Sequence, residues 1–198
     1  MNRSKTFSLN AIVKVGVLAA FSYILMFIQM PIPIAPPFMK VDLADVPALI
    51  GGFAMGPWYG VLIQLIKNLL NLTKTSTGGV GELSNFIVGA VYVYISASIY
   101  KNRKTKKTAL FALSMGVIAM TIVATLSNAF VVFPTYAKVM GLDLNAFVAM
   151  TSKTNGLVTS YFSLMLLSIA PFNIVKGLIS SLVTDLVYKR VSPIIKYS

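Results

Sequence analysis

Three long apolar stretches constrain the fold of this chain more than any other feature. Ile12–Met30, Phe86–Tyr100 and Ala109–Phe133 carry almost no charge. A helix that crosses the hydrocarbon core of a bilayer needs roughly 20 such residues. We therefore expect an all-α integral membrane protein.

The composition supports the same expectation. Of the 198 residues, 57% are hydrophobic and 11% are charged, and the mean hydropathy is +0.80. A soluble domain averages about 25% charged residues. We expect residues 1–198 to form a single membrane domain with no soluble domain attached. A cleaved signal peptide is not expected, because the first apolar run is long and lacks a small-residue cleavage site.

The residue types exclude several kinds of chemistry. Cys and His are both absent, which removes thiol catalysis, disulfides, imidazole bases and the commonest zinc and haem sites. The chain also lacks a glycine-rich P-loop motif, so it cannot hydrolyse ATP by that mechanism alone. We expect no metal site.

Basic residues gather in three clusters, and these predict the topology. They are Arg3/Lys5, then residues 101–107, then Lys189/Arg190/Lys196. The net charge of +12 does not indicate nucleic-acid binding, because lysine and arginine in short loops beside apolar helices normally mark the cytoplasmic side. If all three clusters are cytoplasmic, an even number of crossings separates each pair.

This parity predicts six transmembrane helices, with the N- and C-termini cytoplasmic. The stretch 46–72 is interpreted as two short helices that turn at Gly56-Pro57. Pro171 is interpreted as the start of the last span, with Leu157–Ala170 as a helical or irregular lead-in. The expected helices are roughly 8–30, 46–56, 58–72, 82–101, 108–133 and 171–190.

Polar side chains inside a membrane are costly and are candidates for function. The predicted topology puts the few present in the outer half of the membrane: Asn68, Asn71, Glu82, Asn85, Asn128, Asn173 and Lys176. Asn173 and Lys176 share one helical face and could bind the edge of a planar heterocycle. Alternatively, Lys176 reaches the interface and Asn173 caps the helix.

Two further segments carry candidate ligand-binding residues. The run Thr77–Glu82 is a glycine-rich turn into a helix; its backbone N–H groups could bind hydroxyls, or its glycines could simply permit the turn. Asp42 and Asp45 precede the second helix. Capping is the favoured interpretation for Asp45, and the role of Asp42 stays open.

Four motifs resemble those of a known family, the riboflavin-specific substrate-binding (S) components of energy-coupling factor vitamin transporters. These are residues 38–51 (FMKVDLADVPALIG), 65–70 (LIKNLL), 76–86 (STGGVGELSNF) and 171–177 (PFNIVKG). They occur in the family's order, and the chain length and helix number also agree. Residues 134–170 show little resemblance.

The resemblance implies a high-affinity riboflavin receptor in the bacterial cytoplasmic membrane. It also implies partners, a transmembrane coupling protein and two cytoplasmic ATPases, with riboflavin as the transported ligand and no cofactor. Asn128, Asn173 and Lys176 would bind the pyrimidine edge. The ring and polyol would contact a second set: Met39, Asp42, Asn68, Gly78, Gly79, Gly81 and Glu82. Gly16, Ala19 and Ala20 on the first helix resemble the surface that contacts the coupling protein.

Two alternatives remain. The chain could be an S component for another vitamin such as thiamin or biotin, although thiamin calls for a buried carboxylate and biotin for a cation, and the Asn/Lys set suits a neutral ligand better. An intramembrane enzyme would need clustered acidic, His or Ser/Lys groups. With five acidic residues and no His, we expect no catalytic residues.

Overall fold

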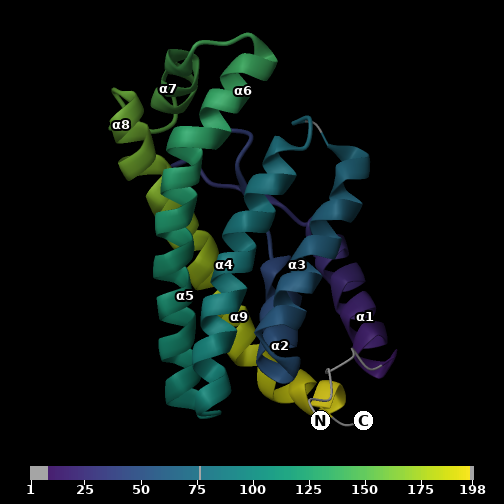
Figure 1. The fold of residues 1–198 in the computed structure, drawn as a ribbon. Helices are drawn as coiled ribbons and strands as arrows, with labels where there is room; N and C mark the ends of the chain where they lie inside the picture. Colours follow the sequence, from purple (N-terminus) through teal and green to yellow (C-terminus); the bar gives the residue numbers. More distant parts are fainter. Residues whose placement is uncertain (1–8, 76, 197–198) are drawn as a thin grey trace, which may run out of the picture.

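The computed structural model describes residues 9–75 and 77–196, which form a bundle of helices (Figure 1). The α-helices are α1 (Leu9–Leu25), α2 (Asp45–Met55), α3 (Pro57–Asn71), α4 (Val80–Asn102), α5 (Lys106–Ser127), α6 (Phe133–Met140), α7 (Leu144–Ser152), α8 (Tyr161–Leu164) and α9 (Ala170–Lys196). A 3-10 turn, η1 (Leu72–Lys74), follows α3. Two π-helical turns, η2 (Asn128–Val132) and η3 (Met165–Ile169), join neighbouring helices. The first basic cluster, Arg3/Lys5, lies outside the described residues.

Three helices in the described part of the chain are long and apolar enough to cross a membrane. They are α4, the continuous helix Lys106–Met140 and the continuous helix Tyr161–Val191. The second has 35 residues, which at 1.5 Å per residue is about 52 Å, well beyond the roughly 30 Å hydrocarbon core. Helices α1 and α2 are apolar but shorter.

Both long helices continue through a proline at which the sequence predicted a boundary. We expected one helix to end at residue 133 and another to begin at 171. Instead Pro134 and Pro171 lie inside continuous helices, each as the second residue after a π-helical turn. A proline leaves the carbonyl four residues earlier without its helical donor, and Leu167 O accepts a hydrogen bond from Asn155 Nδ2 at 3.0 Å. Local rearrangement and a side-chain donor therefore keep the helix intact.

The two short helices α2 and α3 turn at Gly56-Pro57, as predicted. Gly56 has φ of 126°, a conformation that favours glycine, and Pro57 begins α3. The helices then pack closely, because a Cβ on Gly60 would lie 2.8 Å from Ala48 O and 3.0 Å from Gly52 Cα. Helix α2 lies in the main apolar core, with Leu49 fully buried.

The remaining basic clusters lie at one end of the bundle. The first turn of α1, the α4–α5 connection and the last turns of α9 all lie at the lower end in Figure 1. Lys106 Nζ lies 3.9 Å from Asp185 Oδ2, which joins the connection to α9. The turn before α4 and helices α6 and α7 lie at the opposite end.

Candidate ligand-binding site

A cavity of about 500 Å³ lies between the upper parts of α4, the η2 turn, α9 and the segment that joins α1 to α2. Its lining combines apolar and aromatic side chains with amides and charged groups. The lining residues are Met26, Gln29, Pro37, Phe38, Met39, Lys40, Asp42, Asn71, Thr77, Gly81, Glu82, Ser84, Asn85, Val88, Asn128, Val132, Tyr136, Phe172, Asn173 and Lys176. Small-molecule sites typically have volumes of about 300–1,000 Å³ and a few placed polar groups among apolar walls.

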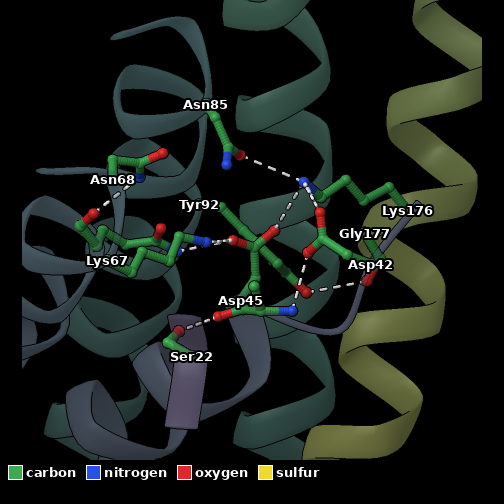
Figure 2. Close-up of polar contacts among 11 residues, drawn as sticks. Ser22, Asp42, Asp45, Lys67, Asn68, Asn85, Tyr92, Lys176 and Gly177 are labelled. Atoms are coloured by element: carbon green, nitrogen blue, oxygen red, sulfur yellow. Dashed lines mark hydrogen bonds and ion pairs between the residues drawn. The ribbon is translucent and has the colours of Figure 1, made fainter. Parts of the chain in front are cut away.

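Lys176 lies at the centre of the polar wall and is shared between two carboxylates. Its Nζ lies 3.6 Å from an oxygen of Asp42 and 3.6 Å from an oxygen of Asp45, and it donates to Asn85 Oδ1 at 3.3 Å. Figure 2 shows the side chain reaching from α9 toward these three groups. Lys176 is buried, so it does not extend to the membrane interface.

Tyr92 positions this part of α9 relative to α4. Its hydroxyl donates to Gly177 O at 2.9 Å and lies 2.6 Å from Ser181 Oγ. Because Gly177 directly follows Lys176, the hydrogen bond holds the backbone that carries the lysine (Figure 2).

Asp45 does not cap α2, contrary to the sequence prediction. It is the first residue of that helix, and its carboxylate accepts from Lys67 Nζ at 2.7 Å and from Gln64 Nε2 at 2.9 Å. Asp42 is the residue that stabilises the start of α2, because its Oδ1 accepts from Ala44 N at 2.9 Å. The sequence could not show that α3 presents a lysine and a glutamine to Asp45.

The charges in this cluster balance. Asp42 and Asp45 contribute two carboxylates, and Lys67 and Lys176 contribute two ammonium groups. A buried charge is costly unless it is paired and hydrogen-bonded. The wall therefore presents hydrogen-bonding atoms to the cavity without an excess of charge, which favours a neutral ligand.

Asn128 and Asn173 lie next to the two π-helical turns. Asn128 opens η2, and Asn173 follows η3 by one helical turn. Each amide donates to the carbonyl four residues earlier, to Ala124 O and Ile169 O respectively, both at 2.8 Å. These bonds fix the amide orientations. Asn173 lies inside a continuous helix and so does not cap a helix start.

Glu82 closes the other end of the cavity and is held by three donors. Asn71 Nδ2 donates to Oε1 at 3.1 Å, and the hydroxyls of Thr75 and Thr77 donate to Oε2 at 2.9 Å each. Gly78 and Gly79 have φ of 60° and 88°, so they form the turn that precedes α4. Carboxylate, amide and hydroxyl groups together form a patch suited to a polyol.

A proline-rich segment, residues 31–39, covers the cavity. The two-residue strands β1 (Met30–Pro31) and β2 (Lys40–Val41) pair antiparallel at its base. Ser168 Oγ donates to Ile34 O at 2.6 Å, which ties the segment to η3. Phe38 packs against an aromatic cluster on α6 and α7, with ring centroids 5.9–6.1 Å apart. The cluster consists of Phe133, Tyr136 and Phe147.

The structure brings most of the predicted ligand residues to this cavity. Those that line it are Met39, Asp42, Gly81, Glu82, Asn128, Asn173 and Lys176. Asn68, Gly78 and Gly79 are not among the lining residues; Asn68 Nδ2 donates to Gln64 O at 2.8 Å. Sequence reasoning missed Lys67, although a lysine within a predicted membrane helix was an available signal. It also missed Phe38 and Tyr136, which nothing in the sequence distinguishes from packing aromatics.

The three residues predicted to contact a coupling protein divide between two faces of α1. Gly16 and Ala20 lie on an exposed face. Ala19 is fully buried in the main apolar core. An outward contact from α1 can therefore use Gly16 and Ala20 but not the Ala19 side chain.

A helical bundle with three helices long and apolar enough to cross a membrane in its described part, and with a cavity lined by both polar and apolar groups, has the features of a membrane receptor for a small molecule. The family model described as "ECF transporter, substrate-specific component" matches residues 10–188. The chain belongs to this family of energy-coupling factor transporter components, which take part in transport and are not enzymes.

Sequence relatives and a solved structure agree with this family. The riboflavin transporter RibU of Staphylococcus aureus (strain TCH60) is 35% identical over 185 residues, covering 93% of this chain and 92% of the relative. The riboflavin transporter FmnP of Bacillus subtilis (strain 168) is 30% identical, covering 92% of each. A solved S component of a bacterial ECF transporter aligns with a TM-score of 0.73 and 33% identity, over 94% of this chain and 98% of that one.

Proposed function

We propose that this chain is the riboflavin-binding S component of an energy-coupling factor transporter and that riboflavin occupies the 500 Å³ cavity. The observation that carries the proposal is the wall on which Asn128, Asn173 and Lys176 meet. Their amide and ammonium groups offer donors and acceptors to the alternating N–H and C=O groups of a pyrimidine edge. The relatives named as riboflavin transporters support the same ligand.

The rest of the cavity matches the other parts of an amphipathic flavin. Met39, Val132 and Phe172 offer apolar surface to the tricycle, and Asp42 extends the polar wall. Gly81, Glu82 and their hydroxyl and amide neighbours face the polyol chain. Asn68, Gly78 and Gly79 do not contact the ligand in this proposal. They stabilise the local structure of α3 and of the turn before α4.

In this proposal the chain lies in the bacterial cytoplasmic membrane with six helices across or within the bilayer and both termini inside. The gathering of the basic α4–α5 connection and the end of α9 at one end supports that orientation. The cavity then opens toward the outside. A transmembrane coupling protein and two cytoplasmic ATPases would supply the energy, and α1 would offer Gly16 and Ala20 to the coupling protein.

A fluorescence titration of the detergent-purified protein tests the ligand. Riboflavin should co-purify as a yellow, fluorescence-quenched species that is released on denaturation, and added riboflavin should be quenched on binding. Asn173→Ala should weaken binding about tenfold, as expected for loss of one or two buried hydrogen bonds. The matched control is Asn102→Ala, which removes an exposed amide at the far end of α4 and should bind as the parent does.

A colourless protein that does not quench riboflavin at micromolar concentration would contradict this ligand. Thiamin and biotin are then tested in the same preparation by calorimetry. Binding of either would keep the chain in the same class of receptor with a different vitamin.

A further inference from the structure

A second cavity, of about 260 Å³, lies at the lower end of the bundle in Figure 1, where the α4–α5 connection meets α2 and α9. It shares no lining residue with the riboflavin cavity. Its volume is below the roughly 300–1,000 Å³ of small-molecule sites, so it suits a small group better than a whole cofactor.

The mouth of this second cavity is basic. Lys104, Lys106 and Lys189 line it with exposed side chains. Asp185 is the one acidic residue among the lining residues, and it lies 3.9 Å from Lys106 Nζ. The side chains at the mouth therefore carry an excess of positive charge that an anion would neutralise.

The interior combines aromatic surface with a buried hydroxyl. Phe53 stacks on Tyr100 at 4.3 Å between ring centroids, and Tyr188 packs edge-on against both. Thr184 lines the same cavity and is 0% exposed, yet its Oγ1 has no hydrogen-bond partner within the part of the chain that is described. Because Thr184 lines the cavity, a ligand bound there is a candidate partner for this hydroxyl.

We propose that this cavity binds the phosphate headgroup of an anionic phospholipid. Basic pockets between transmembrane helices at the cytoplasmic surface are suited to such headgroups. Exposed leucines directly follow lining residues on two walls: Leu110 follows Ala109, and Leu186 follows Asp185. Apolar side chains for acyl chains thus lie on the same helical turns as the lining residues of the basic mouth, whereas a carboxylate of a partner protein would require no such surface.

Native mass spectrometry of the full chain in detergent tests the site, with phosphatidylglycerol and phosphatidylcholine as probes. The parent protein should retain phosphatidylglycerol in preference to phosphatidylcholine. The triple variant Lys104→Gln/Lys106→Gln/Lys189→Gln should lose at least about tenfold in apparent affinity, since each basic residue near an anionic surface contributes about 1 kcal/mol. Riboflavin quenching should be unchanged and reports that the variant is folded.

The matched control changes the same charge at the same end of the molecule. Lys101, Arg103 and Lys107 are exposed but do not line the cavity. Their combined replacement by Gln should leave phosphatidylglycerol retention within about twofold of the parent. If both triple variants lose affinity equally, the attraction belongs to the basic surface in general and the proposed site is wrong.

The buried hydroxyl gives a second test that changes no charge. Thr184→Val keeps the side-chain shape and should weaken phosphatidylglycerol binding about fivefold by removing one hydrogen bond to the headgroup. Thr121→Val is the control, because Thr121 Oγ1 is also buried without a partner in the described structure but lies in neither cavity. Equal retention by both valine variants would overturn the role of Thr184.

Two more outcomes would overturn the lipid assignment. Inorganic phosphate that displaces phosphatidylglycerol at comparable concentration would make the site one for a free anion. Unchanged lipid retention by the Lys104/Lys106/Lys189 variant, together with lost assembly with the energising subunits, would make it a protein contact. The phospholipid site is supported if phosphatidylglycerol retention falls in the Lys104/Lys106/Lys189 variant and is not reduced by inorganic phosphate.

Discussion

Lys67 Nζ lies 2.7 Å from Asp45 Oδ1, and the two side chains are 0% and 1% exposed. This pair links α3 to the start of α2 and lies beside Asp42 and Lys176 (Figure 2), which line the proposed riboflavin cavity. Asp45 is also 3.6 Å from Lys176, so the pair influences a proposed ligand residue without lining the cavity itself. Buried ion pairs of this kind are sensitive to the loss of one partner.

Lys67→Met should destabilise the protein by about 3 kcal/mol, because it leaves the buried Asp45 carboxylate with Lys176 as its only ionic partner. It should also draw Lys176 toward Asp45 and weaken riboflavin binding. Thermal unfolding in detergent and a quenching titration measure the two effects.

Lys67→Met/Asp45→Leu is the control for the pair. Replacing both buried charges with apolar groups should recover much of the lost stability. It should not recover riboflavin affinity, because Lys176 then pairs with Asp42 alone. Recovery of both properties would show that riboflavin binding does not require the pair.

Glu82→Gln should distinguish the two ends of the bound ligand. The substitution weakens acceptance of hydrogen bonds at the end assigned to the polyol, so riboflavin affinity should fall about tenfold. A flavin ring without the ribityl chain should bind Glu82→Gln and the parent equally. Asn173→Ala should weaken the binding of both ligands in quenching titrations. If Glu82→Gln weakened binding of both ligands and Asn173→Ala left binding of the bare ring unchanged, the proposed orientation would be reversed.

Gly60→Ala should destabilise the fold by about 1–3 kcal/mol through overpacking. A Cβ there would meet the backbone of Ala48 and Gly52, which cannot move aside without separating α2 from α3. Gly16→Ala is the matched control, because nothing lies within 4 Å of a Cβ at that position. Thermal unfolding of both variants in one detergent makes the comparison.

Gly16→Leu should separate binding from transport. The bulky side chain would lie on the exposed face of α1 and should obstruct close approach of another helix. Riboflavin quenching by the purified variant should equal that of the parent, while riboflavin uptake by cells that express the full transporter should fall severalfold. Normal uptake would remove this face of α1 from the coupling contact.

Much of the helical framework could be predicted because local signals specify it. The apolar runs predicted α1, α4 and most of α5, and Gly56-Pro57 predicted the turn between α2 and α3. The largest errors occurred at Pro134 and Pro171, which ordinarily end helices; the first helix also ends at Leu25 rather than near residue 30. Here a π-helical turn precedes each proline and the helix continues. The donor to Leu167 O is Asn155, a residue outside the helix.

The polar residues of the site were predictable as a set but not in their contacts. Asn128, Asn173 and Lys176 were functional candidates because polar side chains inside a membrane are costly in free energy. Their motifs also resembled those of a riboflavin-binding family. Residue type could not reveal that Asp45 faces Lys67 and Lys176, because these residues lie on three different helices.

The sequence by itself determined that this chain is a bundle of apolar helices with basic segments at the α4–α5 connection and near the end of α9, because hydrophobic length and charge are local properties. Only the tertiary structure decided which charges neutralise one another, which of Gly16 and Ala19 faces outward, and which side chains enclose each cavity. Those outcomes depend on the packing of α2, α3, α4 and α9 against one another. Packing joins residues that are distant along the chain, and no local pattern encodes such distances.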